Sequence, residues 1–152
     1  MQIPMIGELT KDLELDWLCS DPVPVPLLGG KSCVFVLEAY EDDPNKQDFH
    51  GAIAAFLSLD AATMRTVEPY VFQYFVEFTT LADDRGFSLD PNCRQVKSAG
   101  EVLGLVDLRH EVVVSRRPYG ECGVYISVEG RCLWEIEHGI QIVFKAGSAV
   151  SK

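Results

Sequence analysis

The sequence lacks the features of membrane proteins, secreted proteins and nucleic-acid-binding proteins. No segment is apolar for long enough to cross a bilayer, and stretches such as residues 34–37 and 140–144 have the length of a strand. The amino terminus shows neither the basic nor the hydrophobic segment of a signal peptide. Basic residues are few, 13 against 23 acidic ones, and the formal charge of −10 argues against nucleic acid as a partner. We therefore expect a cytoplasmic protein that binds neither membranes nor nucleic acid.

Cysteine is present, but not in a pattern that indicates disulfide bonds or a zinc site. The five cysteines are an odd number, and no C-x-x-C pair occurs among them. They are spread along the chain as Cys19, Cys33, Cys93, Cys122 and Cys132. We interpret them as reduced thiols, as is usual in a cytoplasm.

The composition is that of a folded protein. Hydrophobic residues make up 47% and charged residues 24% of the 152 positions, which is enough to bury a core. The length predicts a single domain over residues 1–152. The acidic balance would suit a basic protein partner, since opposite charges speed association.

The first third of the chain has the patterns of strands. Apolar and acidic residues alternate over positions 13–17, which predicts a half-buried strand there. Residues 21–26 contain three prolines, so this segment is expected at a sheet edge or as an extended link. Gly29 and Gly30 predict a turn into a strand at residues 32–39.

The middle of the chain is expected to be helical. Asp43 followed by Pro44 predicts a helix start, and residues 49–57 carry one apolar stripe. A second stripe over residues 64–78 is interrupted by Pro69, which predicts a kink or two shorter helices. A further short helix is expected at residues 98–105.

The last third has the pattern of a β-meander, with strands expected at 111–115, 123–128, 132–136 and 140–144. Strands and helices are thus segregated along the chain. The sequence predicts an α+β fold, in which an antiparallel β-sheet of N-terminal strands plus the C-terminal meander packs on two or three central helices.

One motif concentrates chemically active groups: Trp134-Glu135-Ile136-Glu137-His138-Gly139. We take Trp134, Glu135, Glu137 and His138 as the candidate binding residues. Carboxylates and imidazoles are metal ligands and general acid–base groups, so a metal-dependent hydrolase or metal-binding protein using Glu135, Glu137 and His138 is one interpretation. The spacing matches neither the helical H-E-x-x-H pattern nor an EF-hand loop.

A hairpin turn is the other interpretation of the motif, and the one we favour. A three-residue loop of Glu137, His138 and Gly139 pairs apolar with apolar residues: Ile136 with Ile140, Trp134 with Ile142, and Cys132 with Phe144. Glu135 then faces Gln141 on a polar face. The last loop position requires the left-handed conformation that glycine adopts readily. We expect no cofactor, and Gly30-Lys31-Ser32 lacks the earlier glycine of a phosphate-binding loop.

The sequence resembles an uncharacterised bacterial family of unknown function. The run from Leu133 to Phe144 is similar to a family signature, W-E-x-E-H-G-[LI]-Q-[IL]-V-F. The stretch from Phe49 through Pro69 to Tyr74, and the opening Gly7-Glu8-Leu9 with Asp16 and Trp17, are similar as well. The resemblance implies a small cytoplasmic bacterial protein and carries no catalytic residue.

Three functional hypotheses follow from these observations. The leading one is a non-catalytic binding protein, in its concrete form an immunity-like or antitoxin-like partner of a basic bacterial protein. The metal hypothesis described above is the second. The third is a binder of a small molecule or peptide in a pocket between sheet and helices or at a strand edge. Formation of a homodimer is compatible with all three.

Overall fold

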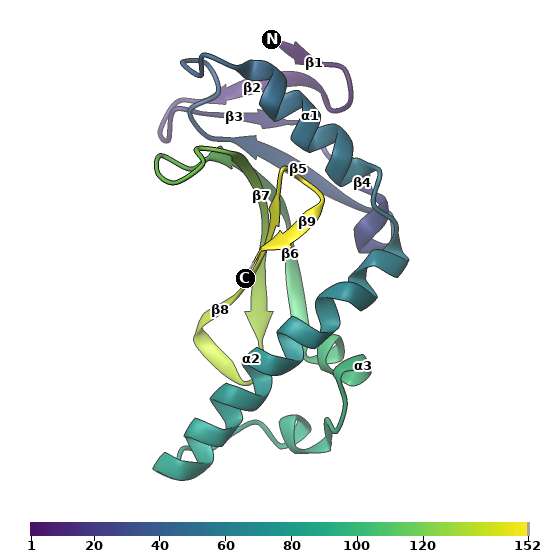
Figure 1. The fold of residues 1–152 in the computed structure, drawn as a ribbon, viewed down its shortest axis with the longest axis vertical. Coiled ribbons are helices and arrows are strands. Elements are labelled where there is room, and N and C mark those ends of the chain that lie inside the picture. Colours follow the sequence, from purple (N-terminus) through teal and green to yellow (C-terminus); the bar gives the residue numbers. More distant parts are fainter. Residues whose placement is uncertain (152) are drawn as a thin grey trace.

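The computed structural model describes residues 1–151 and shows the α+β fold predicted from the sequence (Figure 1). Within this range, the strands are β1 (Gln2–Ile3), β2 (Gly7–Asp12), β3 (Trp17–Ser20), β4 (Val23–Val25), β5 (Lys31–Leu37), β6 (Val106–Arg116), β7 (Val124–Cys132), β8 (Glu135–Lys145) and β9 (Ala149–Ser151). The α-helices are α1 (Lys46–Leu57), α2 (Met64–Arg85) and α3 (Ala99–Val102). No helix in the described range combines the length and the hydrophobicity needed to span a membrane.

The sheet is mixed rather than wholly antiparallel as the sequence suggested. Its strand order is β1-β2-β3-β5-β6-β7-β8-β9, with β4 paired to β5. Every pair is antiparallel except β5 with β6, where Val36 lies opposite Val113 in a parallel register. The parallel pair arises because the long helical segment between these two strands returns the chain to the same end of the sheet.

Helices α1 and α2 cover one face of the sheet (Figure 1). The hydrophobic core lies between these helices and the sheet. Phe56 of α1 makes edge-on ring contacts with Phe35 of β5 and Phe144 of β8. In α2, Phe75 packs edge-on against the ring of Trp134. These contacts confirm the apolar stripes that the sequence predicted for both helices.

The amino-terminal strand prediction for residues 13–17 is wrong. Residues 13–16 form the turn between β2 and β3, and Leu13 is 91% exposed. The Asp12 carboxylate accepts hydrogen bonds from the backbone N–H groups of Glu14 and Leu15, which closes the turn locally. The hydrogen bonds to Asp12 therefore favour a turn at these residues, although their alternating apolar and acidic pattern is typical of a strand.

The helix boundaries also differ from the expectation. α1 begins at Lys46 with Asn45 as its N-cap, so Asp43 is not the cap. α2 runs through Pro69 as one helix of 22 residues, so this proline does not divide it into two shorter helices. Further along the chain, the Asp90 carboxylate accepts a hydrogen bond from the backbone N–H of Asn92 and forms a turn.

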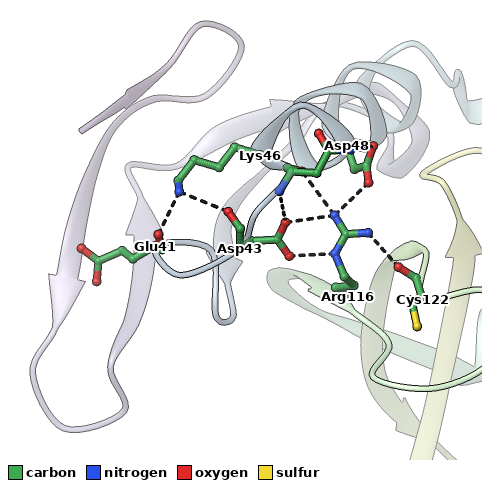
Figure 2. A network of polar contacts seen from close by, with 7 residues as sticks. Glu41, Asp43, Lys46, Asp48, Arg116 and Cys122 are labelled. Atoms are coloured by element: carbon green, nitrogen blue, oxygen red, sulfur yellow. Dashed lines mark hydrogen bonds and ion pairs between the residues drawn. The ribbon is translucent and has the colours of Figure 1, made fainter.

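Asp43 instead takes part in an ion-pair network that anchors α1 to the sheet (Figure 2). Arg116 at the end of β6 donates from Nε to Asp43 at 2.7 Å and from Nη2 to Asp48 at 2.8 Å. Its Nη1 donates to the carbonyl of Cys122 at 2.7 Å. The hydrogen bond from Arg116 lowers the pKa of the Asp43 carboxyl. The guanidinium thus joins the segment before α1 to the loop between β6 and β7.

Candidate functional site: the bulge of β8 and the open face of the sheet

The motif of the sequence lies in a β-bulge, and the predicted three-residue hairpin is wrong. β7 turns at Leu133 and Trp134 directly into β8, so that Cys132 lies opposite Glu135 rather than Phe144. The next pair is Gly130 with Ile140, and four residues of β8 therefore face one residue of β7. We call residues 136–139 the β8 bulge. Bulges of this kind often redirect side chains at functional sites.

Glu135 holds the β8 bulge in place. Its side chain is buried, and its carboxylate accepts hydrogen bonds from the backbone N–H groups of Glu137 at 3.2 Å, His138 at 2.6 Å and Gly139 at 3.0 Å. Burial acts to raise the pKa of Glu135, but these donors outweigh it and hold the pKa below its usual value. The sequence placed Glu135 on the polar sheet face opposite Gln141, and the structure contradicts this because the carboxylate satisfies the loop's backbone donors.

Helix α2 holds the bulge from the other side. The Tyr74 hydroxyl donates to the carbonyl of Gly139 at 3.1 Å, and its ring meets Trp134 edge-on. Burial raises the pKa of Tyr74 to about 12, so the hydroxyl remains a donor at neutral pH. Gly139 has a φ of +71°, the left-handed conformation that the sequence predicted for it. A Cβ atom there would lie 2.3 Å from the carbonyl oxygen of Gly130.

Three of the candidate binding residues converge. Ligand atoms of Glu135, Glu137 and His138 lie within 4.8 Å of one another. Nδ1 of His138 is 3.3 Å from the Glu135 carboxylate. Glu137 and His138 are exposed, whereas Trp134 is buried in the core beneath them. A metal ion at this position would compete for carboxylate oxygens that already accept three backbone hydrogen bonds.

The bulge forms one wall of a cleft of about 560 Å³ beside the start of β6 and the end of β7. The apolar part of its lining comes from Leu105, Leu133 and Ile136. The charged or titratable part comes from Asp107, Arg109, Arg131, Glu137 and His138. Ile136, at the start of the bulge, is 82% exposed. A volume of this size is typical of clefts that hold small molecules.

The face of the sheet opposite the helices carries an apolar row, which we call the open face. The row crosses five strands as Cys19, Val36, Val113, Ser127 and Val143, each lying opposite the next. Tyr125 and Val34 lie on the same face, because side chains alternate along each strand. Although Val36 is only 3% exposed, none of these side chains belongs to the core that the helices cover.

Carboxylates surround this apolar row. Glu38 follows β5 and is half-buried, yet within residues 1–151 its carboxylate makes no hydrogen bond or ion pair. Burial raises the pKa of Glu38, and the negative charge of Glu129 on β7 raises it further. Arg109 is only loosely paired with Glu129, at 3.8 Å. Glu38 is thus a partly desolvated anion beside a second anion, and a cationic group from a partner would stabilise both.

The sequence could not identify Glu38, Arg109 or Arg131 as functional candidates. Alternation within β5 puts Glu38 on the same face as Val34 and Val36, but it does not show that this face lacks a helix. Arg131 lines the cleft only because the β8 bulge, residues 136–139, forms the neighbouring wall. Both facts depend on which strands pair.

Comparison with known proteins gives a family but no activity. A family model with the description "Domain of unknown function (DUF6985)" matches residues 5–152. No curated protein and no solved structure matches the chain significantly.

Proposed function

Because the chain belongs to the family described as Domain of unknown function (DUF6985), whose description names no activity, we propose a function from the structure: binding of a basic protein through the open face. The observation that carries this proposal is the half-buried carboxylate of Glu38, which makes no hydrogen bond or ion pair within residues 1–151 and whose pKa burial and the negative charge of Glu129 both raise. Removing a charge from water costs free energy that a bound lysine or arginine would offset.

Two further features support a basic partner for this surface. The partly exposed side chains of Cys19, Val113 and Val143 in this row offer apolar area for burial, and they do not belong to the core under the helices. The formal charge of −10 favours encounter with a positively charged protein and disfavours self-association across the same face. An immunity-like or antitoxin-like role in a bacterium is the concrete form of this proposal.

The test compares capture of the native partner by two variants of equal charge. Glu38→Lys with Glu129→Lys reverses two charges on the open face. Glu77→Lys with Asp84→Lys makes the same change on exposed positions of α2, on the other side of the sheet. We expect the wild type and the α2 variant to capture the same basic protein, released by salt, and the open-face variant to lose at least about tenfold in affinity.

The result would contradict the proposal if both variants lost the partner equally, because general electrostatic attraction would then suffice. Capture of an acidic protein, or of nothing at low salt, would also contradict it. Circular dichroism of both variants checks that the charge reversals leave the fold intact.

A metal site is the second candidate function, favoured by the convergence of Glu135, Glu137 and His138. Elemental analysis and native mass spectrometry of protein purified without chelator would test it. A stoichiometric metal that is lost in His138→Ala would support the site. A metal-free protein would leave Glu135 with the role of holding the bulge.

A further inference from the structure

The cleft beside the β8 bulge carries charged groups that the fold does not use. Asp107 on β6 lies directly opposite Arg131 on β7, the arrangement in which a cross-strand ion pair is expected. Within residues 1–151, however, neither side chain makes a hydrogen bond or an ion pair, and neither does the carboxylate of Glu137. Opposite charges therefore lie side by side in the cleft, and both are available to a ligand.

The charge of the cleft limits what it can bind. A simple anion would be repelled by the net charge of −10 and by Asp107 and Glu137 in the lining. A simple cation would meet the guanidinium groups of Arg109 and Arg131. A zwitterion avoids both kinds of repulsion because each of its charges can pair with a group of opposite sign in the cleft.

Spacing and polarity narrow the ligand further. Cβ atoms of directly opposite residues on paired strands lie about 5 Å apart, so the longer side chains of Asp107 and Arg131 can both reach one small ligand. The ammonium nitrogen and the carboxylate carbon of an α-amino acid are about 2.5 Å apart, so such a ligand can contact both side chains at once. Leu105, Leu133 and the exposed Ile136 add an apolar surface next to these charges. The cleft volume of about 560 Å³ leaves room for a large side chain.

We propose that this cleft binds a free α-amino acid with a large apolar side chain. Arg131 receives the carboxylate, Asp107 and Glu137 receive the ammonium group, and Leu133 with Ile136 contacts the side chain. The site adjoins the proposed partner surface, because Arg109 of the cleft pairs with Glu129, but none of the ligand contacts named here involves Glu38, Glu129 or the apolar row.

The experiment titrates the protein with four related probes and follows binding by calorimetry and by NMR shifts of the cleft residues. L-leucine carries both charges, N-acetyl-leucine only the carboxylate, leucinamide only the ammonium group, and N-acetyl-leucinamide neither. We expect L-leucine to bind at least about tenfold more tightly than each of the other three, since each lacks a charge-assisted contact. Equal binding of all four, or no binding of L-leucine at millimolar concentration, would overturn the proposal.

Two variants show where the ligand binds. Arg131→Gln and Asp107→Asn should each weaken L-leucine binding by about tenfold and reduce its preference over one of the singly charged probes. Arg65→Gln and Asp84→Asn make the same chemical changes on exposed positions of α2 and should leave binding unchanged. Unaltered affinity in both cleft variants, with their fold intact by circular dichroism, would contradict this site.

Discussion

At the scale of single residues, a carboxylate of a type common in active sites has a structural role in this protein. Glu135 is 8% exposed, and its carboxylate oxygens accept hydrogen bonds from the backbone N–H groups of residues 137–139. Such buried charge is tolerated because several donors surround it. The neighbouring Glu137 is exposed and its carboxylate has no such role, so the pair offers a matched comparison.

We predict that Glu135→Gln lowers the free energy of unfolding by roughly 2–3 kcal/mol at pH 7, because an amide NH₂ group replaces one acceptor oxygen among backbone donors. Glu137→Gln should change it by less than about 0.5 kcal/mol. Chemical denaturation of the three proteins gives both values. A similar effect for the two substitutions would show that Glu135 does not hold the bulge.

The pH dependence follows from the lowered pKa of Glu135. A carboxyl whose pKa is lower when folded contributes stability that is complete above its unfolded value, near 4.5, and is lost as the pH falls through the folded pKa. The wild type should therefore lose more stability than Glu135→Gln on acidification below pH 4.5. Parallel stability curves for the two proteins over this range would contradict the assignment.

At the scale of elements, close backbone contacts explain why the bulge joins β7 as it does. A Cβ atom on Gly130 would lie 2.4 Å from the carbonyl oxygen of Asp107 on β6, and one on Gly139 would lie 2.3 Å from that of Gly130. Three chain segments thus meet where only glycine leaves room. The same meeting brings Arg131 and Glu137 to the cleft.

We predict that Gly139→Ala destabilises the protein by at least about 2 kcal/mol, since it combines a left-handed backbone with a steric clash. Gly51→Ala in α1 is the control, because a Cβ atom there meets nothing within 4 Å. It should stabilise the protein by about 0.5–1 kcal/mol through helix propensity. Thermal denaturation distinguishes the two, and a tolerated Gly139→Ala would mean that the bulge can rearrange.

At the scale of the whole molecule, helices α1 and α2 cover one face of a twisted sheet, and the other face is the one for which we propose a partner (Figure 1). The 23 acidic residues are distributed over a chain with only 13 basic ones, so repulsion between carboxylates opposes the compact state. The Arg116 network offsets part of this repulsion by joining Asp43 and Asp48 to one cation (Figure 2).

We predict that raising the NaCl concentration to about 0.5 M increases Tm by a few degrees, because salt screens the repulsion between exposed charges. The increase should be smaller in Glu77→Gln with Asp84→Asn, which carries two fewer negative charges. Differential scanning calorimetry at neutral pH measures both. A decrease of Tm with salt would show that ion pairs outweigh the repulsion.

The sequence by itself determined the fold class, the apolar stripes of α1 and α2, and the left-handed glycine at position 139, because these depend on short-range patterns and on backbone sterics. It also determined the sign of the surface charge. Only the tertiary structure decided that β5 and β6 pair in parallel, that Glu135 turns inward, and that Glu38 and Arg131 find no ion-pair partner among residues 1–151. Those properties depend on which distant segments meet, and the local pattern of residues 132–145 favoured a three-residue hairpin that the structure does not contain. The close approach of Gly130 and Gly139 selects the bulged register, because backbone groups far apart in sequence must fit together there.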